Sequence, residues 1–121
     1  MTRRKKLENK LDKMCSEKVK ELAGWRCEKC GRENCKLDWH HIFKRSKRST
    51  RWDLGNGLCL CFVCHRLGAH SPDWGIIREF DKWLEWHMGS DKIVTLEQKS
   101  NQLKKHSLDE LESLILEIEN G

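Results

Sequence analysis

Tyrosine is absent from this 121-residue chain, and proline occurs only once, at Pro72. The chain also lacks an apolar run long enough to cross a bilayer, and no apolar signal segment precedes its cysteines. The basic N-terminus leads into a charged amphipathic stretch instead. These absences exclude a membrane-spanning protein and predict one that makes no membrane contact.

Apolar residues are also few, at 37% of the chain, while charged residues make up 36%. A chain of this length and composition has a small, marginal core, which a structural metal would help to stabilise. We expect one compact unit with three parts. They are a basic N-terminal helix over 1–24, a metal-bound core over 25–71 and a helical C-terminal extension over 72–121.

Seven cysteines are present, and their arrangement argues against a secreted disulfide scaffold. Their number is odd, and four of them form two Cys-x-x-Cys pairs, Cys27/Cys30 and Cys61/Cys64. Disulfides are rare in reducing compartments, so the sequence predicts a cytoplasmic protein with free thiols. Cys59 alternates with Leu58 and Leu60, which predicts a buried strand thiol.

The four paired cysteines can form a tetrahedral thiolate site for a structural Zn²⁺, which stabilises a fold and performs no chemistry. The two pairs are separated by 30 residues. A simple zinc ribbon has about 15–20 residues there, so we expect a functional insertion between the pairs.

The formal net charge is +5, and it is unevenly distributed. Basic residues crowd the N-terminal helix and the segment 44–51, whereas the last fifteen residues are acidic. This asymmetry favours a polyanionic partner that binds the basic side of the protein. A basic surface that only contacts solvent explains the charge equally well. The candidate DNA-backbone contacts are Lys44, Arg45, Lys47, Arg48 and Arg51.

The hydrophobic pattern predicts an α+β fold, in which a two-stranded antiparallel hairpin and a helix form a small zinc-stapled core. A helix is expected over 3–23, capped by Thr2, with strands over 37–42 and 58–61 and a long basic loop up to Gly55. Further helices are expected from Phe62, from a Ser71-Pro72 start to Met88, from Ser90 or Asp91, and from a capping box at Ser107.

Two expectations concern packing of the helical extension. Trp74, Trp83 and Trp86 are expected in its core rather than as base-stacking residues. The last helix carries an apolar stripe formed by Leu111, Leu114, Ile115 and Ile118. We expect this stripe either to pack on the preceding helix or to mediate self-association.

Histidines and one asparagine lie between and beside the cysteines. His40 and His41 are adjacent on a strand and point to opposite faces, so one can bind a metal while the other faces a substrate. His65 follows Cys64 and is turned about 100 degrees from it on a helix. His70 is about 140 degrees from His65 on an ideal α-helix, so we expect it to join a metal only if the helix breaks near Gly68.

The pattern Cys27-x-x-Cys30, His40-His41-Ile42, Asn56 and Cys61-x-x-Cys64-His65 resembles the HNH endonucleases, the zinc-bound branch of the ββα-metal or His-Me finger nucleases. The likeness covers about a third of the chain. More loosely, Arg51-Trp52-Asp53, His70-Ser71-Pro72 and the helical tail are similar to phage recombination endonucleases of the NinG/Rap kind, which act on branched DNA.

By this resemblance, His41 is the general base that activates water, and His40 and His65, with His70 as a further candidate, are ligands of a catalytic divalent cation, Mg²⁺ or Mn²⁺. Asn56 either orients His41 or braces the loop. Asp38 is an exposed strand carboxylate or supports the metal ligands. Arg51 is the candidate for stabilising transition-state charge.

The implied reaction is hydrolysis of DNA phosphodiester bonds with little sequence preference, on duplex or branched DNA. Paired cuts on two strands would favour a homodimer. A phage-encoded protein of this kind would work in the host cytoplasm. The alternative is a zinc-stabilised nucleic-acid-binding module without catalysis, which needs the cysteines and basic loop but not the histidines.

Overall fold

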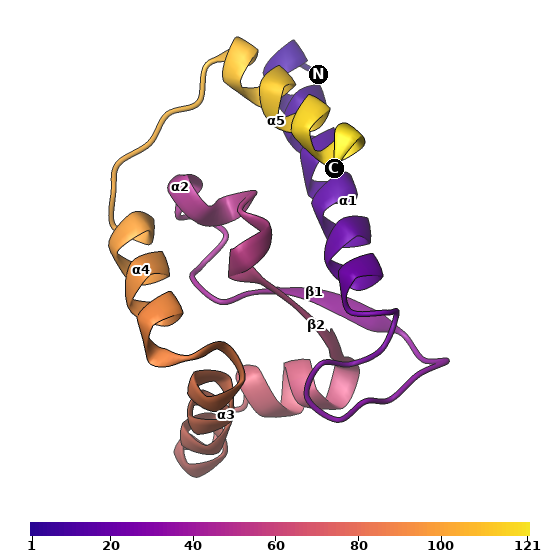
Figure 1. The fold of residues 1–121 in the computed structure, drawn as a ribbon, viewed down its shortest axis with the longest axis vertical. Coiled ribbons are helices and arrows are strands. Elements are labelled where there is room, and N and C mark those ends of the chain that lie inside the picture. The colour runs from indigo at the N-terminus through magenta and orange to yellow at the C-terminus, as the bar shows by residue number, and fades with distance from the viewer.

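Two short antiparallel strands lie at the middle of the structure, a computed structural model that describes residues 1–121 (Figure 1). β1 (Leu37–His41) pairs with β2 (Gly57–Cys61), so that His41 is opposite Gly57 and Leu37 is opposite Cys61. Gly57 is required at this place, because a Cβ there would lie 2.7 Å from the Trp39 indole nitrogen. The hairpin thus holds the histidine doublet at one end and Cys61 at the other.

The helices surround this hairpin. They are α1 (Arg3–Leu22), α2 (Arg48–Arg51), the 3₁₀-helix η1 (Leu54–Asn56), the π-helix η2 (Val63–Ala69), α3 (Trp74–Met88), α4 (Ser90–Ser100) and α5 (Leu108–Asn120). The predicted α+β class, the antiparallel hairpin, the N-terminal helix and the helical C-terminal region are confirmed. None of these helices combines the length and the apolar character that a bilayer crossing needs.

Local capping explains several helix ends. The Thr2 hydroxyl accepts a hydrogen bond from the Lys5 backbone at the start of α1, as predicted. The capping box at the start of α5 is complete, with Ser107 and Glu110 each accepting from the other's backbone N–H. Gly89, at φ 88°, ends α3 in a conformation that residues with a Cβ rarely adopt.

Two predicted boundaries were wrong. The segment after β1 is not one long loop, because it contains α2 and η1. The helix after Pro72 is not capped by Ser71. Asp73 is its cap, because its carboxylate accepts hydrogen bonds from the Gly75 and Ile76 backbones. Asp is as good a helix cap as Ser, and Asp73 lies two residues closer to the helix than Ser71.

The buried residues form two clusters. One joins the hairpin to the Cys27 segment, α3 and α4, and its members are Cys27, Leu58, Leu60, Cys61, Phe80 and Leu84. The other joins α1, α5 and the α2 region, and its members are Leu11, Cys15, Trp52, Leu111 and Ile115. The helical extension is therefore divided between two cores.

Helix α5 packs beside α1, not on the preceding α4 as its apolar stripe suggested (Figure 1). Ion pairs link Arg3 to Glu112 and Lys10 to Glu119, so the two helices run parallel. The acidic face of α5 meets basic residues of α1. The buried contact of Leu11 and Cys15 with Leu111 and Ile115 holds the helices together, and the exposed ion pairs add little. Hydrophobic periodicity identifies the apolar face of α5 but not the helix that covers it.

The expectation for the tryptophans was also wrong in two of three cases. Trp74 and Trp86 on α3 are 71% and 80% exposed, and only Trp83 is partly buried. Helix α3 lies at the edge of the molecule and buries one narrow face, carrying Phe80 and Leu84.

Substitution of Leu111 tests the α1–α5 contact. Because Leu111 is fully buried between these helices, Leu111→Ala should lower the free energy of unfolding by about 2–5 kcal/mol in urea denaturation. Leu116→Ala on the same helix is the control, since Leu116 is 56% exposed. Equal effects of the two substitutions would contradict the observed packing.

Candidate metal centres and active site

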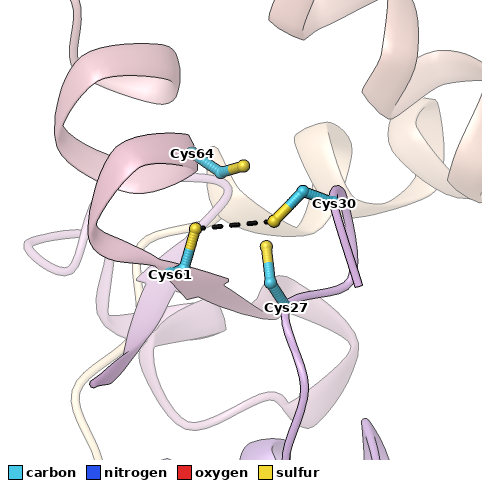
Figure 2. A group of neighbouring side chains, drawn as sticks. All are labelled: Cys27, Cys30, Cys61 and Cys64. Carbon is cyan, nitrogen blue, oxygen red and sulfur yellow. Dashed lines mark hydrogen bonds between the residues drawn. The ribbon is translucent and has the colours of Figure 1, made fainter. Parts of the chain in front are cut away.

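Four thiols converge at the Cys61 end of the hairpin (Figure 2). Cys27 and Cys30 come from the tight turn before β1, Cys61 ends β2, and Cys64 lies in η2. All four sulfur atoms lie within 4.8 Å of one another, and Cys30 Sγ is 3.6 Å from Cys61 Sγ. Zn–S bonds of 2.3 Å give tetrahedral sulfur separations of about 3.8 Å, so these residues fit a structural zinc ion.

The surroundings of the thiols favour ionisation at one of them. Burial opposes ionisation of Cys27, but backbone N–H groups of Cys30, Cys61 and Lys29 outweigh it and lower the pKa of Cys27 to about 7. Burial instead raises the pKa of Cys64. Metal binding therefore requires loss of protons, and affinity should fall as the pH falls.

The remaining buried thiols have a different role. Burial raises the pKa of Cys15 to about 12 and that of Cys59 to about 11. Cys59 is fully buried on β2, as predicted. These thiols pack as small apolar groups and are unreactive.

Glu28 anchors the cysteine turn, a role that the sequence did not indicate. Its backbone N–H donates to the Cys59 carbonyl at 2.8 Å, and its carboxylate accepts from the Cys59 N–H at 2.6 Å. The other carboxylate oxygen lies 3.0 Å from His87 Nε2 on α3. Glu28 thus joins the turn to β2 and α3.

Three imidazoles form a second cluster. One ring nitrogen from each of His40, His65 and His70 lies within 4.8 Å of the other two. The expectation that the helix must break near Gly68 for His70 to join was wrong. Residues 63–69 form a π-helix, and the His70 N–H donates to the His65 carbonyl at 2.9 Å. In a helix with i→i+5 hydrogen bonds, residues five positions apart are separated by about one turn. His65 and His70 therefore lie next to each other on the same face of the helix.

The electrostatics of this cluster favour neutral rings at His40 and His70. Burial, followed by the charges of His65 and His70, lowers the pKa of His40 to about 3, and burial also lowers the pKa of His70. Asp38 Oδ2 lies 3.0 Å from His65 Nδ1 and is partly buried, not an exposed carboxylate. This bond leaves His65 Nε2 free, which is a common arrangement for a metal-binding histidine. The donor set fits a divalent transition-metal ion.

His41 points to the other face of β1, as adjacent strand residues must. Its ring packs on Trp39 at a centroid distance of 4.1 Å, and its Nε2 lies 3.1 Å from the Arg51 carbonyl oxygen. Burial lowers its pKa, which favours the neutral form. A hollow of about 400 Å³ is lined by His41, the three clustered histidines, Lys44 and Arg45.

Asn56 is fully buried and holds the basic loop in place. Its amide oxygen accepts from the Phe43 N–H at 2.8 Å, and its amide nitrogen donates to the Phe43 carbonyl at 3.0 Å and the Thr50 carbonyl at 3.2 Å. Of the two roles expected for Asn56, these contacts correspond to bracing the loop.

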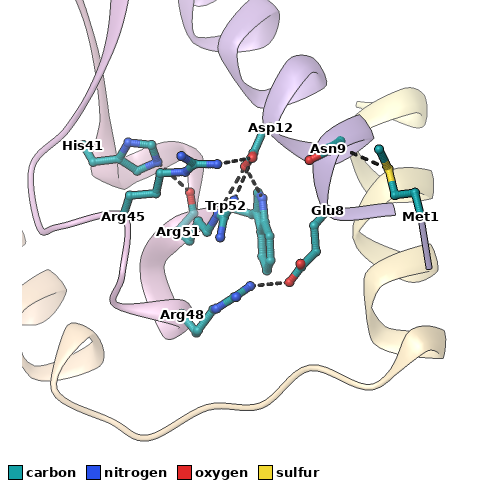
Figure 3. A network of polar contacts seen from close by, with 9 residues as sticks. All are labelled: Met1, Glu8, Asn9, Asp12, His41, Arg45, Arg48, Arg51 and Trp52. Carbon is teal, nitrogen blue, oxygen red and sulfur yellow. Dashed lines mark hydrogen bonds and ion pairs between the residues drawn. The ribbon is translucent and has the colours of Figure 1, made fainter. Parts of the chain in front are cut away.

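Arg51 is buried and paired, so it does not reach the surface as a phosphate contact would. Its guanidinium donates to both carboxylate oxygens of Asp12 on α1, at 3.2 and 2.7 Å, and Trp52 Nε1 donates to the same carboxylate at 2.9 Å (Figure 3). The Arg51 carbonyl contacts His41. Asp12 therefore holds the residue that positions the predicted base.

The other predicted DNA contacts remain at the surface. Arg45 donates to Asp12 at 2.8 Å, yet its side chain is 59% exposed. Arg48 pairs with Glu8 and is 44% exposed. Lys47 donates to the Asn101 side chain at 3.3 Å, and Lys44 lines the histidine hollow.

Comparisons with protein-family models, curated proteins and solved structures found no match to this chain.

Metal analysis tests the four-cysteine site. Cys61→Ser should remove one zinc ion per chain and lower thermal stability, because three thiolates bind zinc more weakly than four and the metal stabilises the fold. Elemental analysis and thermal melts, with and without a chelator, measure both effects. Cys35→Ser is the matched control, since Cys35 is exposed and lies outside the cluster. Unchanged zinc content in Cys61→Ser would contradict the assignment.

Asp12→Asn tests the network on α1. Burial would raise the pKa of Asp12, but hydrogen bonds from Arg51 and Trp52 and the charge of Arg51 lower it below its ordinary 3.8. The substitution leaves the buried Arg51 charge uncompensated, so stability at neutral pH should fall by about 3–5 kcal/mol in urea denaturation.

Because the pKa is lowered, the stabilisation by Asp12 is complete above pH 3.8 and is lost as the pH falls below it. The difference between parent and variant should therefore narrow in acid. Glu79→Gln, which removes an exposed ion pair with Lys82, should cost at most about 1 kcal/mol. A similar cost for both variants would show that the Asp12 network contributes little.

Proposed function

We propose that this chain is a metal-dependent DNA endonuclease of the HNH type, which hydrolyses phosphodiester bonds. The observation that supports the proposal is one hollow lined by the three-histidine cluster, by His41 and by two cationic side chains. A module that only binds nucleic acid has no use for three imidazoles that converge on one point.

His41 acts as the general base in this proposal. When Nε2 donates its proton to the Arg51 carbonyl, Nδ1 carries the lone pair that takes a proton from water. The lowered pKa of His41 keeps that lone pair free at neutral pH. Asn56 braces the loop on which Arg51 lies, and Asp12 holds the Arg51 side chain.

His40, His65 and His70 hold the catalytic cation, and Asp38 orients His65. When bound, the cation stabilises the negative charge that develops on the phosphate. Imidazole ligands suit first-row transition metals better than Mg²⁺, which prefers oxygen ligands. Of the two ions expected from the sequence, we therefore favour Mn²⁺.

Lys44, Arg45, Lys47 and Arg48 contact the DNA backbone. Contacts of this kind position DNA without reading its sequence, so cleavage has little sequence preference. The looser likeness to NinG/Rap enzymes favours branched or recombination-intermediate DNA, a cytoplasmic location in the host of a phage, and a dimer for paired cuts. The rival proposal remains a zinc-stabilised nucleic-acid-binding module without catalysis.

Cleavage of plasmid and four-way-junction DNA with Mn²⁺ or Mg²⁺ tests the proposal. We expect cleavage that depends on added metal and is faster with Mn²⁺. His41→Ala should reduce the rate by about 10²–10⁴-fold, the usual contribution of a general base. DNA binding and zinc content should persist in this variant.

Trp86→Ala is the control, because Trp86 is an aromatic residue of α3 that is 80% exposed and lies outside the hollow. It should cleave like the parent. DNA binding without metal-dependent cleavage by the parent would favour the binding module, and full activity of His41→Ala would refute the assigned base.

A further inference from the structure

A second basic hollow lies at the N-terminal end of α1. Its volume is about 180 Å³, and it is lined by Arg4, Glu8, Arg48, Lys104, Lys105 and His106. These residues come from three separate segments, namely α1, α2 and the connection between α4 and α5. Four cationic side chains thus face a single carboxylate, which is a charge balance suited to an anion.

Much of this positive charge is available at the surface. Glu8 is only 5% exposed and forms an ion pair with Arg48, whose side chain is 44% exposed. Lys104 pairs with Glu110, but Arg4 and Lys105 have no ion-pair partner in the structure. The partly buried His106 is kept neutral, because burial and then the charge of Lys104 lower its pKa.

Two ion pairs on α1 link this hollow to the basic edge of the histidine site. Arg4, Glu8 and Asp12 are four residues apart on one face of α1. Asp12 holds Arg45, which lines the histidine hollow, and Glu8 holds Arg48, which lines the second hollow (Figure 3). In both pairs the carboxylate is the more buried partner and the guanidinium faces outward.

The length of this basic surface can be compared with DNA. Eight residues of α-helix, from Arg4 to Asp12, span about 12 Å. Phosphates of one strand of B-DNA are spaced by about 3.4 Å along the helix axis. The face of α1 from Arg4 to Asp12 is therefore about as long as the axial rise of three to four base pairs.

We propose that the hollow lined by Arg4, Arg48, Lys104 and Lys105 is a second phosphate-binding site, which holds the DNA backbone on the α1 side of the reaction site. The inference rests on the proposed function for its ligand, the phosphodiester backbone. Its role is to align the strand along α1, so that the scissile phosphate reaches the histidine hollow.

Salt-dependent binding tests this site separately from catalysis. The double variant Arg4→Gln/Lys105→Gln is made in the His41→Ala background, and binding of a fluorescent 20-base-pair duplex is followed by anisotropy at several salt concentrations. Each lost phosphate contact should reduce the slope of log K against log salt by about 0.9, so the double variant should lose nearly two.

Lys36→Gln/Lys92→Gln in the same background is the matched control. Both lysines are exposed, lie outside the hollow and form no ion pair in the structure. Each of the two double variants removes two positive charges. This control should keep a slope close to that of the parent. Equal slopes for the two double variants would overturn the second site, whether or not the parent cleaves DNA. A reduced slope without cleavage by the parent would retain the site and reject only the nuclease.

Discussion

The convergence of four cysteine sulfurs determines the geometry of the rest of the site. The turn that carries Cys27 and Cys30 has no strand or helix of its own, and η2 buries none of its residues fully. Glu28 and the cysteine cluster together join the turn to the hairpin, and Cys64 brings η2 into the same cluster. Because His65 directly follows Cys64, the position of Cys64 in the cluster also places the His65 imidazole beside β1. There it contacts the Asp38 carboxylate and the His40 ring.

A second constraint acts from the other face of the hairpin. Asp12 on α1 binds Arg51 and Trp52, and the Arg51 carbonyl contacts His41. The two faces of β1 are thus positioned by different parts of the molecule, the metal ligands by the cysteine cluster and the proposed base by α1. The same division is seen in the two buried clusters, of which one includes residues of α3 and the other residues of α1.

Features carried by short segments could be predicted from the sequence. The hairpin, the Thr2 cap, the Ser107 capping box and the cysteine cluster all follow from neighbouring residues or fixed spacings. Contacts between distant segments could not. Glu28 to His87 and Asp12 to Arg51 each join residues that carry no shared pattern. The exposure of Trp74 and Trp86 likewise depends on how little of α3 is covered.

The sequence by itself determined the kinds of ligand available, because thiols and imidazoles at these spacings limit the possible metals and because adjacent strand residues must face opposite ways. Only the tertiary structure decided which of them meet. The π-helical winding of η2, not a break at Gly68, brings His70 to His65, and burial by α1 removes Arg51 from the surface that its position in a basic run suggested. Both outcomes depend on packing between distant segments. Such packing pairs Arg51 with Asp12 and sets which face of η2 carries His70, and the local sequence around each residue does not determine either result.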